Sequence, residues 1–548
     1  MSNSCFSKDS SPYSVFTLRS CAAVVLAEAV TRTFPKAQLV SCGATDLGFA
    51  CDFVVDEDLD AAALRLIEEQ MQQRIVEEPA VSSAEMVGEN AANYFQHHKQ
   101  KLRSVIVAED HNEELIDLWR IGEFMELCPQ PHVASLKSLR AFSLEELFVQ
   151  NLTLPNGEPL RVTRISGVIA PNRQALKQLL RKRKGAAARA HQRLGRDAEL
   201  FGWHPAAETA GWLWYPRGTI LREILLRWWE QEVLALGAEK VHTPEDLPSR
   251  ALHALIYQAT EANPPVFYAE IRSQLNEEEE HDTCGLLRAR RVTSDECTWI
   301  GPQDQTHEAL VKLLNLLNRS CQLYPETTRL VFPVREGEQC KQADWKIGVQ
   351  LLKGALDDSS WELPWEEDPG FQSELPALYC LQQDALGREW PIARLEIDPA
   401  LPRKLELYPH SPPIMWAQAA ALLNLERTIA LLLEQNAGLL PLWLAPEQVR
   451  LLTVGAGANN YARAIHEDWR QKKLRTGLDC SDKKLADKVF DAEKCKVPYV
   501  IVIGEKEQQS ERVTLRTPSQ TTKGQTLSPQ EIVAQLHEEI DSSSMLPK

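Results

Sequence analysis

Apolar residues recur at helical spacing in several segments of the chain. Residues 17–32 place four apolar side chains near one face, which predicts a helix. Residues 219–236 form a second amphipathic stretch that ends before Gly237, a residue typical of helix ends. Its apolar side chains, Trp228 and Trp229 among them, fit a core or a subunit contact. Residues 417–434 are mostly apolar, with Glu426 and Arg427 as interruptions, and predict a long buried helix.

Other segments have the pattern of strands. Residues 161–169 predict a strand, and residues 260–400 alternate strand-like runs with acidic loops. Residues 378–383 and 388–397 flank the turn sequence Asp-Ala-Leu-Gly and predict a hairpin.

The last hundred residues predict a small α/β domain. Strand-like runs at 449–454, 497–503 and 513–517 are followed by a helix that begins after Ser528. The sequence Ser-Pro-Gln-Glu there combines a capping box with proline at the first helical position. We therefore expect an α/β fold in this part and a multidomain α+β organisation over the chain.

Composition fits a globular, multidomain protein. The 548 residues correspond to three or four domains of about 150 residues, and the 44% hydrophobic content argues against a disordered or fibrous chain. Twelve cysteines without a C-x-x-C motif favour reduced thiols over a disulfide framework. No uncharged apolar run reaches membrane-spanning length, so we expect a cytoplasmic protein without membrane contacts.

Charge is distributed unevenly. The net charge of −17 excludes a simple polycation, yet residues 172–196 hold nine basic side chains and no acidic one. This segment is either a solvated charged helix or a stripe that contacts phosphates. The basic residues are Arg173, Lys177, Arg181, Lys182, Arg183, Lys184, Arg189, Arg193 and Arg196.

Separated motifs occur in an order that resembles the threonyl-tRNA synthetases, a class II family. They are Cys128–Val133 and Arg164–Gly167 (editing domain), Gly218–Glu223 with Val241–Pro244 (motif 1), Gly285–Arg290 (motif 2), Leu425–Arg427 (motif 3), and Leu442–Val449, Val497–Glu507 and Leu515–Thr517 (anticodon-binding domain). The matches begin near residue 13, so we expect the ubiquitin-like domain that opens most family members to be absent.

The resemblance implies a division of the chain into five parts. These are a flexible tail at 1–16, an editing-like α+β domain at 17–170, a basic linker helix at 171–198, a class II antiparallel-sheet catalytic-like domain at 199–440 and an α/β anticodon-binding-like domain at 441–548. Motif 1 forms the family's dimer contact, so the resemblance also implies a homodimer, or a heterodimer with a true synthetase.

Several residues that the family uses for ATP are changed. The motif 2 arginine position is occupied by Leu275, while Glu277, Arg288 and Arg427 remain as an ATP-binding remnant. The carboxylates that follow Glu277 would repel ATP and the tRNA acceptor end. The glycine expected before motif 3 is Leu423, whose side chain should crowd the nucleotide.

The family's zinc and editing sites are also altered. Thr298 and Gln418 stand at two of the family's three zinc-ligand positions. The N-C-P-G-H segment, which carries the family's cysteine ligand, is missing. We therefore expect no metal and no cofactor, although the family uses zinc, ATP and magnesium. The first editing histidines fall on Ser20 and Val24; Cys128 and His132 remain as an editing-site remnant.

RNA-contacting residues are better retained. Glu507 and Arg516 match family residues that meet the anticodon, whereas two further contact positions are Asp482 and Phe490. With the basic residues Arg181, Lys182, Arg183 and Lys184, they imply tRNA as the partner, and no DNA.

Three interpretations of function remain. The first is a degenerate, tRNA-binding or regulatory paralogue, a pseudoenzyme unable to activate threonine. The alternative is an active ATP-dependent aminoacyl-tRNA ligase, for threonine or for another amino acid. The third is a structural subunit that pairs with a true synthetase. We favour the first, because the changes at motif 2, the zinc ligands and the editing histidines are independent defects.

Overall fold

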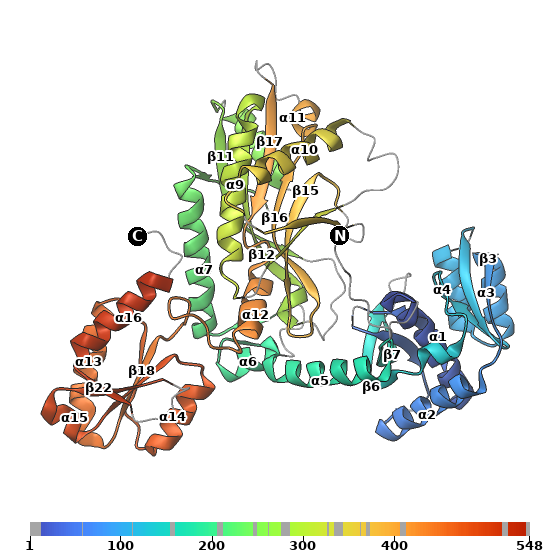
Figure 1. Ribbon diagram of the computed structural model, residues 1–548, viewed down its shortest axis with the longest axis horizontal. Coiled ribbons are helices and arrows are strands. Elements are labelled where there is room, and N and C mark those ends of the chain that lie inside the picture. Colours follow the sequence, from blue (N-terminus) through green and yellow to red (C-terminus); the bar gives the residue numbers. More distant parts are fainter. Residues whose placement is uncertain are drawn as a thin grey trace, which may run out of the picture. The chain divides into compact units, whose positions relative to one another are not determined.

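The computed structural model describes most of the chain. The described residues are 13–45, 47–56, 59–111, 113–153, 159–204, 212–244, 249–260, 262–275, 285–325, 328–333, 343–361, 363–368, 373–405, 413–517 and 524–543. The chain forms two compact units, residues 1–185 and 186–548 (Figure 1). Among the described residues, no helix is both long and apolar enough to cross a membrane.

The first unit is built around a buried helix. Helix α1 (Val15–Thr33) is capped by Ser14 and is buried on nearly all sides, which marks it as the centre of a core. It packs on an antiparallel sheet in the order β1-β2-β7-β6. The strands are β1 (Gln38–Ala44), β2 (Phe49–Val54), β6 (Phe142–Thr153) and β7 (Pro159–Ile169). The predicted helix at 17–32 and strand at 161–169 are confirmed.

A second, three-stranded antiparallel sheet completes this unit. The remaining elements are α2 (Ala61–Glu77), β3 (Val81–Val87), α3 (Gly88–His97), α4 (Lys101–His111), β4 (Leu115–Ile121), β5 (Phe124–Leu127) and η1 (Leu136–Leu139). Arg103 of α4 is buried and its guanidinium binds Glu126 of β5 at 2.6 Å. The basic segment forms two helices, α5 (Arg173–Arg189) and α6 (His191–Asp197), with a break at Ala190.

The second unit contains an eight-stranded sheet in the order β10-β11-β12-β17-β16-β15-β13-β14. Its strands are antiparallel except for the pairs β10·β11 and β13·β14. They are β10 (Glu239–Lys240), β11 (Val266–Leu275), β12 (Arg291–Pro302), β13 (Arg329–Pro333), β14 (Trp365–Asp368), β15 (Ala377–Gln383), β16 (Glu389–Ile397) and β17 (Ile414–Ala420). The predicted hairpin is the pair β15·β16.

Helices bury the apolar face of this sheet. Helix α7 (Pro216–Ala235), α9 (Thr306–Cys321) and α12 (Leu425–Gln435) contribute to one large core with Trp299 and Leu395. Trp228 and Trp229 of α7 lie in this core of their own chain, so they are not the basis for a subunit contact. The other elements are β8 (Phe201–Gly202), β9 (Leu213–Trp214), α8 (Ser249–Ala259), η3 (Gly285–Arg288), η4 (Gln303–Gln305), α10 (Ala343–Asp357) and α11 (Leu401–Lys404).

The predicted helix at 417–434 is wrong in its first half. Residues 414–420 form β17, in the interior of the sheet, and α12 begins only at Leu425. All seven residues of β17 are buried, so its sequence lacks the alternation that distinguishes a strand from a buried helix. Helices α9 and α10 also lie where the sequence predicted only strands and loops.

A five-stranded sheet, β19-β18-β20-β21-β22, forms the C-terminal part. Helices α13 and α16 pack on one face and α14 on the other (Figure 1). The predicted strands and the capping box at Ser528 are confirmed. The elements are β18 (Val449–Thr453), η6 (Ala456–Ala458), α13 (Asn459–Gln471), β19 (Thr476–Asp479), α14 (Leu485–Lys494), β20 (Tyr499–Ile503), α15 (Glu505–Ser510), β21 (Val513–Arg516), β22 (Gln525–Leu527) and α16 (Pro529–Ser543).

Candidate active site and nucleic-acid interface

One face of the eight-stranded sheet is polar, opposite the face covered by α7 and α9. Strand register places Tyr268, Thr298 and Gln418 in one row across β11, β12 and β17. Because side chains alternate along a strand, Glu270 and Glu296 form the adjacent row on the same face. We call this surface the polar face of the sheet.

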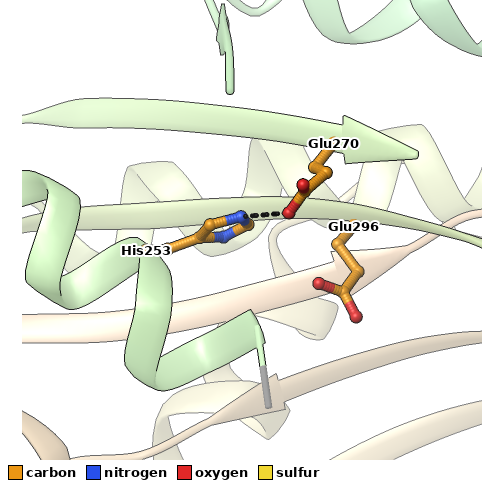
Figure 2. Close-up of side chains that lie close together, drawn as sticks. All are labelled: His253, Glu270 and Glu296. Atoms are coloured by element: carbon orange, nitrogen blue, oxygen red, sulfur yellow. Dashed lines mark hydrogen bonds and ion pairs between the residues drawn. The ribbon is translucent and has the colours of Figure 1, made fainter. Parts of the chain in front are cut away.

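Helix α8 covers part of the polar face with a buried histidine (Figure 2). The Nδ1 atom of His253 lies 2.7 Å from Oγ1 of Thr298, and its Nε2 atom lies 3.2 Å from Oε2 of Glu270. Gln418 donates from Nε2 to the same Thr298 oxygen at 2.9 Å. Thr298 and Gln418, the two positions aligned with zinc ligands, are thus brought together and are hydrogen-bonded to each other. A threonine and a glutamine are poor ligands for zinc, so these positions do not fit the family's ion.

Two carboxylates extend this cluster. Glu270 accepts hydrogen bonds from the backbone N–H and the hydroxyl of Thr243, which follows motif 1. Burial raises the pKa of Glu270, but the hydrogen bonds from His253 and Thr243 outweigh burial and hold the pKa below its ordinary value. Burial lowers the pKa of Arg394, but the charges of Glu396 and Glu296 outweigh this effect and raise it.

The retained arginines of motifs 2 and 3 meet at a tryptophan. The guanidinium carbons of Arg288 and Arg427 lie 5.5 and 5.2 Å from the ring centre of Trp390. Arg427 also donates to the carbonyls of Leu287 and Pro391. Cation–π contacts and backbone hydrogen bonds therefore hold both side chains against the protein itself. Glu277, the third member of the predicted ATP-binding remnant, lies outside the described residues.

Hydrogen bonds of two buried glutamates and a buried histidine join the elements that carry motifs 1, 2 and 3. Glu426 of motif 3 binds Arg222 of the motif 1 helix and accepts a hydrogen bond from the N–H of Thr293, in β12, at 2.7 Å. His191 bonds through Nδ1 to Glu434 of α12 and accepts from the N–H of Leu286 at Nε2. Because Nε2 is an acceptor, Nδ1 carries the proton in this geometry. These contacts fix η3, and with it Arg288, against α12.

Two of the positions that the resemblance assigns to ATP binding, Leu275 and Leu423, are described in the structure. Leu275 is at the end of β11 and its side chain is 60% exposed. Arg272, the cation nearest to it in sequence, is buried and donates to the carbonyl of Pro244 at 2.7 Å. Leu423 has a φ of +52°, a conformation that favours glycine, which agrees with the glycine expected there. The N–H groups of Ala421, Leu422 and Leu423 all donate to buried Asp295.

The editing-site remnant is a compact polar cluster in the first unit. Nε2 of His132 donates to the carbonyl of Cys128 and Nδ1 is hydrogen-bonded to the hydroxyl of Ser83, both at 2.7 Å, and the ring stacks on Trp119. A hydrogen bond between the thiols of Cys21 and Cys128 lowers the pKa of Cys21 and raises that of Cys128. Ser20 and Val24, the substituted positions, are buried in α1.

The basic helix α5 borders a groove of about 810 Å³ in the first unit. Apolar side chains from α2, β6 and α5 line its floor, and basic side chains surround it. These are Arg140, Arg173, Lys177, Arg181 and Lys184. Arg181, Lys182 and Lys184 are exposed, whereas Arg183 forms an ion pair with Glu145 and donates to the carbonyl of Leu47. Three of the four predicted phosphate-contacting residues are thus exposed to solvent, whereas the guanidinium of Arg183 is bound within the same chain.

The C-terminal sheet presents a second polar surface, on the face covered by α14. Arg516 is exposed and pairs in register with Val500, which packs beneath α14. Glu507 caps α15 through the N–H of Gly504 and lies 3.4 Å from the hydroxyl of Thr514, on the same face of β21 as Arg516. Phe490 of α14 is 64% exposed and Asp482 is exposed in the preceding loop.

Sequence reasoning missed three side chains that the structure brings into these clusters. His253 has no motif around it and reaches the polar face only because α8 folds over β11 and β12. Trp390 stands beside the arginines through strand pairing, and Cys21 reaches Cys128 through the position of α1. The available signals were a histidine within an apolar helix and a cysteine next to Ser20, and neither signal is specific.

Comparisons with known proteins agree with the motif order. Residues 448–539 match the family model of an anticodon binding domain. The threonine–tRNA ligase of Nitrosococcus oceani is 27% identical over 91% of this chain and 84% of its own length, and that of Lawsonia intracellularis is 28% identical over 91% and 84%. The solved RNA binding domain of threonyl-tRNA synthetase from Cryptosporidium parvum has the same fold over 64% of this chain and 98% of its own, with a TM-score of 0.58 at 21% identity. The chain is therefore a threonyl-tRNA synthetase-like protein with an anticodon-binding domain.

Proposed function

We propose that this protein binds tRNA but does not activate threonine. The observation that carries the proposal is the state of the two zinc-aligned positions, where Gln418 donates to Thr298 and Thr298 is also hydrogen-bonded to His253. Without the ion, the site lacks the group that binds the amino and hydroxyl groups of threonine in the resembled enzymes.

Changes at the ATP end support the same conclusion. Leu275 offers an exposed apolar side chain where an arginine would stabilise charge on the α-phosphate. Arg288 and Arg427 are turned toward Trp390 and backbone carbonyls. The five-part domain division from the sequence belongs to this proposal, with residues 17–170 as the editing-like part.

Threonine-dependent ATP–pyrophosphate exchange tests the loss of activation. We expect no exchange above background for the purified protein, with an active threonine–tRNA ligase as the positive control. The single substitution Leu275→Arg should not restore exchange, because the zinc-aligned positions remain unsuitable. Exchange with threonine would refute the proposal, and exchange with another amino acid would establish the alternative, an active ligase of altered specificity.

Binding of tRNA is supported by the anticodon-binding domain and by the exposed cations of helix α5. Cations on the groove would contact phosphates, so affinity should fall steeply with salt. Replacing Arg181, Lys182 and Lys184 by alanine should weaken binding of all tRNAs and flatten the salt dependence by about 0.9 per lost phosphate contact. The matched control replaces Lys36, Arg65 and Lys99, exposed cations of the same unit outside the groove.

A filter-binding titration across salt concentrations measures both variants. Equal loss in the two triple variants would show that the groove has no special role. No retained tRNA for the wild-type protein would favour the third interpretation, a subunit that pairs with a true synthetase. Light scattering then separates a homodimer, which we expect from the motif 1 resemblance, from a monomer that requires such a partner.

A further inference from the structure

We propose that His253, Glu270 and Glu296 form a buried site for one zinc ion or a similar divalent transition-metal ion. None of these residues stands at a position aligned with a zinc ligand of the resembled synthetases. The proposal is therefore a different site, built from a different set of donors. It is independent of tRNA binding and goes beyond the proposed function.

The donor atoms have spacing suited to a metal. One donor atom from each of the three side chains can be chosen so that all lie within 4.8 Å of one another. Nε2 of His253 and Oε2 of Glu270 are 3.2 Å apart. Two ligands on a tetrahedral zinc ion, with bonds of about 2.0–2.1 Å, lie about 3.3 Å apart. This pair therefore needs little movement, and Glu296 faces it from the neighbouring strand (Figure 2).

Outer hydrogen bonds orient two of the ligands. Nδ1 of His253 is bonded to Thr298, which leaves Nε2 directed toward Glu270. The carboxylate of Glu270 is held by the N–H and hydroxyl of Thr243. A hydrogen bond to the second ring nitrogen is the usual companion of a metal-bound histidine, because it fixes the tautomer and the ring orientation. With the ion on Nε2, the neutral ring would carry its proton on Nδ1 and donate it to the hydroxyl oxygen of Thr298.

Charge on the polar face favours a cation. The buried carboxylates here belong to Glu270, Glu296 and Glu396; of the nearby arginines, Arg272 is buried and Arg394 is partly buried. Among the described residues of this surface, acidic groups thus outnumber arginines. Buried carboxylates are costly unless cations compensate them. A divalent ion between Glu270 and Glu296 provides that compensation.

The ion would be structural. His253 is 0% exposed and the two glutamates are 2% and 6% exposed, so substrate has no access to it. One carboxylate binding through both oxygens completes four donor atoms from three residues. The ion would join α8 to β11 and β12, which already meet through the apolar contacts of Ala254 and Tyr257 and through the hydrogen bonds of His253.

Calorimetric titration of the chelator-treated, full-length protein with Zn²⁺ tests the site. We expect one ion per chain, and a rise in melting temperature with zinc, because the ion binds only the folded state. His253→Ala and Glu296→Gln should each weaken binding by about 100-fold or more, and Thr298→Val by about 10–100-fold. His307→Ala, at an exposed histidine of the same unit, is the matched control and should bind as wild type.

Cobalt spectroscopy of the wild-type protein keeps the test independent of how the variants fold. Co²⁺ in this site should give visible bands of tetrahedral nitrogen and oxygen coordination, without a thiolate charge-transfer band. Zinc competition should remove the bands. Binding that is absent, unchanged in folded His253→Ala protein, or marked by a thiolate band would overturn the proposal. Absence of zinc would leave the tRNA proposal intact, since that rests on other residues.

Discussion

The polar face of the eight-stranded sheet and the α14 face of the C-terminal sheet both carry polar side chains, but these differ in their exposure to solvent. On the first, Glu270, Thr298 and Gln418 are buried and bonded to one another or to His253. On the second, Arg516 and Phe490 face solvent, while Glu507 caps α15 and Lys488 of α14 is buried against the carbonyl of Thr453.

The contrast separates polar side chains that are bonded within the fold from polar side chains that are open to solvent. A buried polar group must find a partner, so the polar face contributes to stability and to a fixed arrangement of α8, β12 and β17. An exposed cation contributes little to stability and remains available to phosphates or bases. Substitutions on the two surfaces should therefore separate into effects on stability and effects on RNA binding.

The largest effect on stability is expected for Asp295→Ala. This carboxylate accepts three backbone N–H groups at the turn between β17 and α12, and all would be left buried without their acceptor. The free energy of unfolding should fall by about 3–5 kcal/mol, as measured by urea denaturation. Asp482→Ala, in the exposed loop of the C-terminal domain, should stay within about 0.5 kcal/mol of wild type. Equal losses would contradict the comparison.

Acid should weaken the contact between α6 and α12. Burial raises the pKa of Glu434, but hydrogen bonds from His191 and Ala385 outweigh burial and hold it below its ordinary value. The ionised carboxylate thus favours folding above the unfolded value of about 4.3, and this contribution is lost as pH falls through the lower folded pKa.

Glu434→Gln should cost about 1–3 kcal/mol at neutral pH and should lose less further stability than wild type between pH 6 and pH 3. Urea denaturation at several pH values measures the difference. Glu467→Gln, at an exposed glutamate, serves as the control and should follow the wild-type profile. If Glu434→Gln lost more unfolding free energy than wild type on acidification, the predicted direction of the pH dependence would be contradicted.

A smaller effect is expected at the turn before motif 3. Leu423 has a positive φ, so Leu423→Gly relieves backbone strain while adding entropy to the unfolded chain. The two effects oppose each other, and the unfolding free energy should change by no more than about 1 kcal/mol. Leu422→Gly, one residue earlier and fully buried, should lose about 3–5 kcal/mol. Thermal and urea denaturation of the two variants measure these changes in unfolding free energy.

The smallest stability effect, and a distinct binding effect, is expected for Arg516→Ala. Its side chain is exposed, so the free energy of unfolding should change by less than about 0.5 kcal/mol. If Arg516 meets anticodon bases, the variant should discriminate less between tRNAs while its salt dependence stays close to that of wild type. Lys506→Ala, an exposed cation on α15, is the control. A uniform loss for all tRNAs would assign Arg516 to phosphates.

Motif order and turn signals were enough to predict much of the fold. The Ser528 capping box, the Gly237 helix end and the β15·β16 hairpin depend on local chemistry, and each is present. Strand β17 was mistaken for helix because burial on both faces removes its period. The position of His253 depends on how α8 packs across two strands, which no local pattern encodes. For the same reason the neighbours of Arg427 could not be inferred from motif 3 alone.

The hydrogen-bonded cluster around Thr298 also limits which single substitutions its positions tolerate. A histidine at position 298 alone would place a second imidazole against His253 and remove the hydroxyl that bonds to both His253 and Gln418. An apolar residue at position 253 alone would leave buried Glu270 without one of its donors. Each of these single substitutions should therefore lower stability unless a neighbouring side chain changes with it.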